Sequence, residues 1–174
     1  MVHSVEAVFD VDTETRVRTL WDGLAAAGCP SQAGHTAPSN RPHVTLTVTE
    51  QLDDAVDAAL RPVLERLPLP CVVGAPMLFG GGRTVTLVRL IVPSADLLAL
   101  HADVHAACAP FMVKGVLPHA EPGRWTPHVT LGRRIPPERM PLALSVLDLA
   151  HDIEGSLVAL RHWDGNAKQE HWIG

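Results

Sequence analysis

The chain alternates between short strand-like and helix-like hydrophobic patterns. In residues 4–11 every second position is apolar, which predicts an opening strand. Residues 13–28 repeat apolar positions at the spacing of one helix face, which predicts a helix with its N-cap at Asp12 or Thr13. The segment 30–42 is polar and rich in Pro, Gly and Ser, so we expect a loop there.

The same kind of pattern continues to the end of the chain. A strand over 71–79, a turn over 80–83 and a strand over 84–92 form a predicted hairpin near the midpoint. Further strands are predicted over 43–48, from His128 and over 153–163, and further helices over 53–67, over 94–109 and from Pro136. The order strand-helix-strand-helix-strand therefore occurs twice, followed by a tail without a clear pattern.

The pentapeptide Pro-His-Val-Thr-Leu occurs twice, at 42–46 and at 127–131. One copy lies in each half of the chain, as an internal duplication would produce. Because alternate side chains of a strand point to opposite faces, the histidine and threonine of each copy share one face and the valine and leucine share the other. Two such strands side by side would line a cleft with two imidazoles and two hydroxyls.

These patterns predict an α+β fold in a single domain over residues 1–174. We expect two lobes related by a pseudo-twofold axis, each a β-sheet with helices packed on its outer face. The join between the lobes is expected near residues 80–84, in the turn of the central hairpin. With one motif in each lobe, a catalytic cleft is expected between the two lobes.

Composition limits the partners of this domain. The 174 residues are 47% hydrophobic and 19% charged, as in a globular domain with a substantial core. A net charge of −5 argues against a long nucleic-acid groove, while a nucleotide or an RNA end remains compatible. The apolar runs are too short for a membrane span, and the first residues lack the form of a signal peptide. We therefore expect a cytoplasmic monomer without membrane contact.

Cysteine and histidine spacing elsewhere in the chain gives little sign of a metal site. Cys29, Cys71 and Cys108 lack the paired spacing of a zinc site, so buried free thiols are expected. His101 and His105 lie four positions apart on one predicted helix, but the stretch lacks the glutamate of a metalloprotease motif. Exposed helical histidines are the favoured interpretation of this pair.

The repeated motif carries the residues needed for phosphodiester chemistry. Two imidazoles that face one phosphodiester suffice for general acid–base catalysis, because one accepts a proton from the nucleophile and the other donates one to the leaving oxygen. The hydroxyls of Thr45 and Thr130 can donate hydrogen bonds to non-bridging phosphate oxygens. This chemistry needs no metal or other cofactor, and neither motif contains a carboxylate that could hold a metal.

Paired His-x-Thr motifs, one in each half of a chain of this length, resemble the 2H phosphoesterase superfamily. The branch that the chain most resembles is the bacterial and archaeal 2′-5′ RNA ligase, or RNA 2′,3′-cyclic phosphodiesterase. The resemblance implies that His43 and His128 are the catalytic pair. It also implies that Thr45 and Thr130 bind the phosphate, and that Arg133 is the basic residue that often follows the second motif.

The resemblance further implies an activity and a substrate class. Members of this branch open 2′,3′-cyclic phosphates to 2′-phosphates, and some join or split 2′-5′ linkages. Which histidine acts as the base stays open, with a preference for His128 as base and His43 as acid. Candidates for contact with a nucleotide base are Phe9, Phe111 and Trp125, a small set in a chain without tyrosine.

Two other functions are compatible with the same residues. A non-catalytic module could bind a nucleotide or an RNA end in the cleft without turnover. A histidine-ligated metalloenzyme would contain bound zinc and would lose activity with a chelator, but neither motif brings a carboxylate or a cysteine to such a site. The predicted function is therefore a metal-independent phosphodiesterase acting on a nucleotide or an RNA end.

Overall fold

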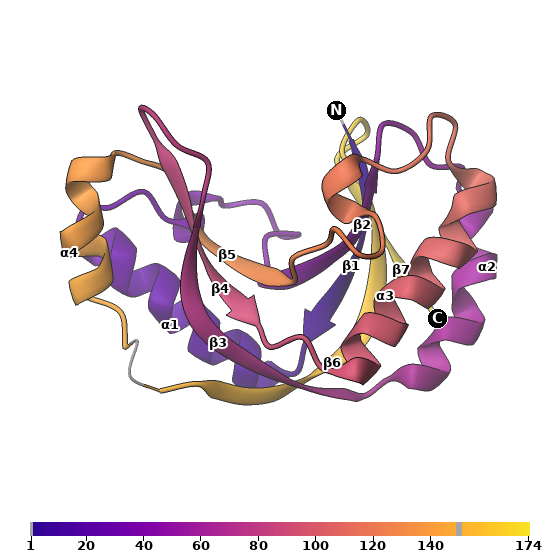
Figure 1. The fold of residues 1–174 in the computed structure, drawn as a ribbon, viewed down its shortest axis with the longest axis horizontal. Coiled ribbons are helices and arrows are strands. Elements are labelled where there is room, and N and C mark those ends of the chain that lie inside the picture. The colour runs from indigo at the N-terminus through magenta and orange to yellow at the C-terminus, as the bar shows by residue number, and fades with distance from the viewer. Residues whose placement is uncertain (1, 149–150) are drawn as a thin grey trace.

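The structure, a computed structural model, describes residues 2–148 and 151–174 (Figure 1). Within these residues the strands are β1 His3–Phe9, β2 His43–Thr49, β3 Leu69–Phe79, β4 Val85–Ile91, β5 His128–Ile135, β6 Ile153–Asp164 and β7 Gln169–Ile173. The α-helices are α1 Val11–Ala26, α2 Val56–Leu60, α3 Ala95–Cys108 and α4 Met140–Ser145. The predicted order of strands and helices is confirmed, and β7 lies in the tail that had no clear pattern.

All the strands belong to one antiparallel sheet, with the order β2-β1-β6-β3-β4-β5 and with β7 paired to β6. The α+β class is therefore confirmed. The sheet is continuous because the first half of β3, Leu69–Val73, pairs with the first half of β6, Leu157–Ile153. The strands of both halves are thus joined in one sheet by the β3–β6 pairing.

The sheet and its helices form two groups of elements that lie side by side (Figure 1). Strands β3, β4 and β5 lie with α1 and α4 on one side, and β1, β2, β6 and β7 lie with α2 and α3 on the other. Each group contains elements from both halves of the sequence, because α1 packs against β5 and α3 packs against β2. Residues 80–84 form the tip of the β3–β4 hairpin, so the passage between the groups lies at β3–β6 and not at this turn.

Local sequence explains where the helices begin and end. The side chain of Asp10 accepts a hydrogen bond from the Thr13 backbone N–H at 2.8 Å, so Asp10 caps α1 and neither of the predicted caps, Asp12 and Thr13, does. Ser94 caps α3 in the same way. The helix predicted over 53–67 is instead α2 followed by a 3₁₀ segment, Arg61–Arg66, because Pro62 lacks the N–H that an α-helix needs there.

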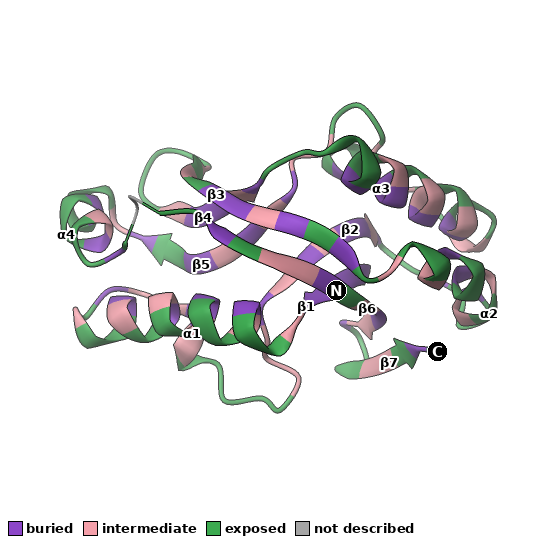
Figure 2. Cartoon of the chain, turned by 90° about the horizontal axis from the view of Figure 1, so that it is seen from below, coloured by how far each residue is buried: buried purple, intermediate pink, exposed green. Residues whose placement is uncertain are grey.

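Helices α1 and α3 cover the sheet through their apolar faces (Figure 2). The buried side chains of α1 include Val17, Trp21 and Leu24, and those of α3 include Leu97, Leu100 and Val104. All three cysteines are buried and free, as predicted. Burial raises the pKa of Cys71 and of Cys108 to about 12, which keeps both thiols protonated and unreactive.

Two tryptophans connect these covering elements to the backbone of the motif strands. Trp21 of α1 donates its indole N–H to the carbonyl of Thr130 at 2.9 Å, and Trp125 donates its own to the carbonyl of Thr45 at 2.9 Å. The ring of His101 on α3 stacks on Trp125, with centroids 4.0 Å apart. Each motif threonine is therefore held by a tryptophan that lies far from it in the sequence.

A cluster of histidines and aspartates connects α2 to strands β1, β6 and β7. Nitrogens of His3 and His162 lie 3.1 Å apart, and Nδ1 of His162 lies 3.3 Å from Asp57 of α2. His171 of β7 approaches the same aspartate, and Asp164 lies 3.4 Å from His3. Burial lowers the pKa of His162, and the positive charges that His3 and His171 can carry lower it further against the attraction of Asp57.

Among the helices in the described part of the chain, none is long and apolar enough to cross a membrane.

The tryptophan hydrogen bonds generate a prediction for stability. Trp21→Phe and Trp125→Phe each remove the N–H donor and part of a packed ring. Each change should lower the free energy of unfolding by about 1–3 kcal/mol, measured by urea denaturation. Trp172→Phe is the control, because that side chain is 45% exposed and its loss should cost under about 0.5 kcal/mol. Equal losses in all three variants would contradict the role of the two hydrogen bonds.

The histidine cluster generates a prediction for pH dependence. The folded pKa of His162 lies below the unfolded value of about 6.5, so the unfolded chain takes up more protons as the pH falls. Its contribution to stability is therefore intact above about pH 6.5 and is lost as the pH falls from there through the folded pKa.

Urea denaturation at pH 7.5 and at 5.5 checks this prediction with His162→Gln and with His35→Gln, an exposed histidine, as control. The loss of stability between the two pH values should be smaller in His162→Gln than in the wild type and unchanged in His35→Gln. An unchanged loss in His162→Gln would show that other groups cause the pH dependence.

Candidate active site

The two motif strands stand at opposite ends of the strand order but are neighbours in space. In β2 the side chains of His43 and Thr45 are half-buried, while Val44 and Leu46 are fully buried. The motif of β5 has the same alternation. The predicted faces of both motifs are therefore confirmed.

A cavity of about 670 Å³ lies between these strands. Both motif histidines and both motif threonines line it, together with Arg133. The other lining residues come from β1, β2, β3, β4, β6 and the loop before β5, namely Val2, Ser4, Glu6, Val48, Phe79, Thr86, Leu117, His119, Ala120, Arg124, Trp125, Thr126 and Trp163. The histidines and threonines of both motifs, which the sequence analysis selected, thus line one cavity.

The same irregularity follows each motif. The register of β2 against β1 shifts at Leu46, and the register of β5 against β4 shifts at Leu131, so each strand has one extra residue at that point. An extra residue of this kind is a β-bulge, which bends a strand and redirects its side chains. Because both bulges fall on the last residue of the motif, the two halves repeat in backbone conformation as well as in sequence.

His128 lies in mostly apolar surroundings. Its Nδ1–H donates to the carbonyl of Thr126 at 2.7 Å, which leaves Nε2 without its proton in the neutral ring. The ring of Phe79 packs edge-on against it, with centroids 4.7 Å apart. Burial lowers the pKa of His128, and the charges of Arg133 and His43 lower it further, against the hydrogen bond to Thr126. A neutral imidazole with a free Nε2 is suited to accept a proton.

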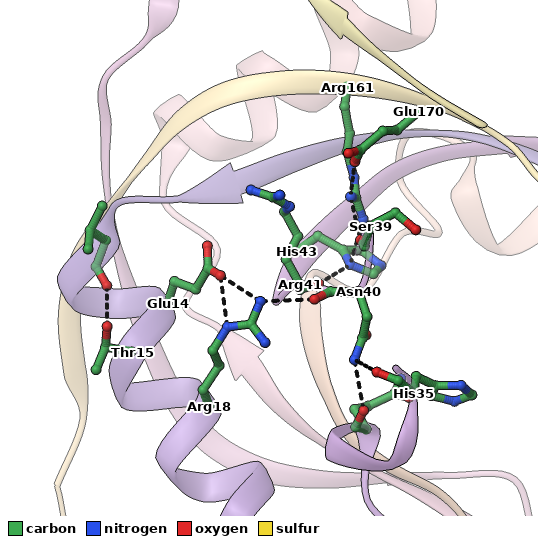
Figure 3. Close-up of polar contacts among 12 residues, drawn as sticks. Glu14, Thr15, Arg18, His35, Ser39, Asn40, Arg41, His43, Arg161 and Glu170 are labelled. Atoms are coloured by element: carbon green, nitrogen blue, oxygen red, sulfur yellow. Dashed lines mark hydrogen bonds and ion pairs between the residues drawn. The ribbon is translucent and has the colours of Figure 1, made fainter. Parts of the chain in front are cut away.

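His43 has polar and charged neighbours. Its Nδ1–H donates to the carbonyl of Arg41 at 2.8 Å, so Nε2 is again the other reactive nitrogen (Figure 3). An oxygen of Glu6 lies 3.5 Å from this Nε2. The guanidinium of Arg161 holds the other oxygen of Glu6 through two nitrogens, each at 2.8 Å.

Glu6 is ionised although it is only 5% exposed. Burial alone would raise the pKa of Glu6, but the charges of His43 and Arg161 and hydrogen bonds from Ser4 and Arg161 bring this pKa below its ordinary value. The two motif histidines therefore lie in unequal environments, one apolar and one beside a carboxylate. The sequence analysis did not identify Glu6 or Arg161, since neither lies in a motif and their meeting depends on strand pairing.

Arginine and histidine side chains line the cavity on the side of β5. Arg133, the residue that follows the second motif, is exposed and contributes to the lining. His119 and Arg124 from the loop before β5 also line the cavity, and both were missed because a loop residue carries no periodicity. Arg41 does not belong to this group, because its guanidinium stacks over Trp172, 4.9 Å from the ring centre.

The aromatic candidates are only partly supported. Trp125 lines the cavity as expected. Phe9 was a wrong candidate, since its side chain is 3% exposed and belongs to the core. Phe111 also packs against the core. Two aromatic residues that were not predicted, Phe79 at the end of β3 and Trp163 near the end of β6, line the cavity and supply the apolar surface in their place.

His101 and His105 do not form an exposed pair. His101 is 2% exposed, stacks on Trp125 and donates from Nε2 to the carbonyl of Ala120 at 3.0 Å. The interpretation of both as exposed helical histidines is therefore wrong for His101, which has a structural role. In residues 2–148 and 151–174 there is no group of three or more His, Cys, Asp or Glu side chains with the geometry to hold a metal ion.

Solved structures with the same fold include phosphoesterases. One described as a phosphoesterase has 14% identity and a TM-score of 0.55, with 98% of this chain and 93% of that chain covered. Escherichia coli LigT complexed with 3′-AMP has 14% identity and a TM-score of 0.52, with 98% of this chain and 91% of that chain covered. Usb1 of Kluyveromyces marxianus with uridine monophosphate has 11% identity and a TM-score of 0.50, with 99% of this chain and 97% of that chain covered. At these identities the likeness shows the fold.

Sequence comparison identifies the family. No curated protein is significantly similar to this chain in sequence. Residues 9–168, however, match the family model of the 2′-5′ RNA ligase superfamily, and this range includes both motifs, the bulges that follow them and most of the sheet. The chain therefore belongs to the 2′-5′ RNA ligase superfamily, within the 2H phosphoesterases.

Proposed function

We propose that this chain is a metal-independent phosphodiesterase that opens 2′,3′-cyclic phosphates of RNA ends or nucleotides to 2′-phosphates. The observation that carries this proposal is the meeting of both His-x-Thr pairs in one cavity, with the two histidines in unequal environments. Two titratable groups with different environments are what a separate acid and base require. The superfamily and its phosphoesterase fold support the same class of reaction.

The proposed mechanism gives His128 the role of base and His43 the role of acid. The free Nε2 of neutral His128 takes a proton from water as the water oxygen forms a bond to phosphorus. The bond between phosphorus and the 3′ oxygen breaks, and its electron pair stays on that oxygen. His43 donates the proton from Nε2 to the 3′ oxygen, so the product is a 2′-phosphate with a free 3′ hydroxyl.

The other cavity residues bind the substrate. Thr45 and Thr130 donate hydrogen bonds to the non-bridging oxygens, where negative charge increases in the transition state, and Arg133 adds a positive charge. Phe79, Trp125 and Trp163 offer apolar surface to the nucleoside. The nucleotides named in the LigT and Usb1 structures support a ligand of this kind. The reverse reaction, which forms a 2′-5′ linkage, would use the same histidines with exchanged roles.

Single histidine variants test the proposal. Hydrolysis of 2′,3′-cyclic nucleotides in the presence of EDTA should continue in the wild type and yield 2′-phosphates. His43→Ala and His128→Ala should each lower kcat by about 10²–10⁴-fold, because each removes one proton-transfer group. Activity that survives either change would exclude the residue from catalysis. A wild type that binds nucleotide through these residues without product would instead be the non-catalytic binding module.

Threonine variants test the assignment of the phosphate contacts. Thr45→Val and Thr130→Val keep the side-chain shape and remove the hydroxyl, so each should lower kcat by roughly 10–100-fold. Thr47→Val is a matched control on the same strand, since this buried hydroxyl has no hydrogen-bond partner in the described structure. Steady-state kinetics on the three variants decides the point. A loss in Thr47→Val as large as in the other two would mean that the strand was disturbed.

A further inference from the structure

A buried carboxylate is an unusual group in a cavity whose proposed chemistry needs only two histidines. Glu6 lines the cavity at the centre of β1 and is 5% exposed. Burying an ionised carboxylate is costly unless other groups compensate its charge and its hydrogen bonds. Here Arg161 binds one oxygen through two nitrogens, and the hydroxyl of Ser4 donates to the other at 2.8 Å. The ionised form is thus held in one orientation.

That orientation presents a negative oxygen to the reactive nitrogen of His43. Nδ1–H of His43 is committed to the carbonyl of Arg41, so Nε2 carries a lone pair when the ring is neutral. A lone pair 3.5 Å from the Glu6 oxygen is repelled by it, whereas an N–H at Nε2 is attracted. The geometry therefore gives an N–H at Nε2 of His43 a carboxylate partner.

Charges of both signs surround His43. Arg161 also donates to a carboxylate oxygen of Glu170 at 2.7 Å and to the carbonyl of Ser39 at 2.8 Å (Figure 3). Its own Nη2 lies 3.5 Å from Nδ1 of His43. Glu6, Glu170 and Arg161 together carry one net negative charge, and a proton on His43 neutralises it. His128 is a further titratable group near His43, and burial lowers the pKa of His128.

The second half of the chain has apolar residues at the equivalent place. In strand register, Glu6 pairs with Thr45 on one side and with Arg161 on the other. The residue that pairs with Thr130 in the same way is Val88, and its other neighbour is Met77. An apolar pair thus occupies the equivalent place beside the second motif. The charged pair therefore distinguishes the surroundings of His43 from those of His128.

We propose that Glu6, held by Arg161, is a positioning residue that stabilises the imidazolium of His43 and so makes His43 the general acid. This inference rests on the two-histidine function proposed above and adds a residue that neither motif contains. In each turnover the proton leaves Nε2 of His43 for the 3′ oxygen of the substrate, and Glu6 favours its return from water. Glu6 itself keeps its charge throughout.

The test compares two substrates that differ in their need for an acid. A 2′,3′-cyclic nucleotide has an alkoxide leaving group that must be protonated, whereas a nucleoside p-nitrophenyl phosphate releases a phenolate that needs no proton. Glu6→Gln should lower kcat/KM for the cyclic nucleotide by about tenfold or more above neutral pH. The alkaline limb of its pH profile should move down by about one pH unit. Cleavage of the nitrophenyl ester should change by less than about threefold, as expected when only the acid is affected.

Control variants separate this role from a structural one. Glu14→Gln removes a carboxylate that pairs with Arg18 at 2.7 Å outside the cavity, so it should leave both activities and the pH profile unchanged. Glu6→Val/Arg161→Met copies the residues that the second half has at this register, so it should fold even if Glu6→Gln does not. It should show the same selective loss on the cyclic nucleotide.

The outcomes separate this inference from the proposed function. Equal losses on both substrates, or an unmoved alkaline limb in the folded variants, would overturn the role of Glu6 while leaving a two-histidine enzyme. A double variant with wild-type rates and pH profile would also overturn it. A wild type that cleaves neither substrate would instead overturn the proposed phosphodiesterase function.

Discussion

The cavity exists only because the two ends of one sheet are brought together. Strands β2 and β5 are last in the strand order, so no further strand fixes their distance from each other. Helix α1 packs against β5 and helix α3 packs against β2, and this packing helps to fix the positions of both strands. The indole N–H groups of Trp21 and Trp125 add hydrogen bonds to the carbonyls of the motif threonines. A backbone carbonyl that is held in place also fixes the direction of its neighbouring side chains. The positions of the motif side chains therefore depend on α1, α3 and the two tryptophans as well as on the motif strands themselves.

The two copies of the motif share one scaffold but have unequal neighbours, and the two proposed chemical roles rest on that difference. Both copies have the same alternation, the same bulge and the same Nδ1 hydrogen bond to a backbone carbonyl two residues earlier. The backbone thus presents Nε2 of both rings in equivalent ways. The difference comes from other strands, because Glu6 of β1 stands beside one ring and Phe79 of β3 beside the other. The repeated backbone gives both rings the same geometry, and their unequal neighbours give them different electrostatic surroundings.

Local sequence patterns predicted the features that depend on neighbouring residues. They did not predict the features that depend on pairing between distant strands. The alternation in both motifs and the helix predicted over 94–109 follow from short-range geometry, and the structure agrees with them. Sequence periodicity does not record contacts between distant segments. It therefore could not predict that β3 pairs with β6, that α1 packs against β5 or that α3 packs against β2. Phe9 was misplaced because alternation separates two faces of a strand without saying which one meets the cavity. Glu6 was missed because its meaning comes from Arg161, 155 positions away.

Contacts between the two halves of the chain also affect the order in which the native structure can form. Trp21 reaches a carbonyl 109 positions later, and Trp125 reaches one 80 positions earlier. Contacts of such long range close slowly, because the loop entropy is lost before the contact compensates for it. On the ribosome, where synthesis proceeds at ~5–20 residues per second, β2 emerges seconds before the segment that clamps it. The first motif strand is therefore an open sheet edge for most of synthesis, and both clamps form only when the chain is nearly complete.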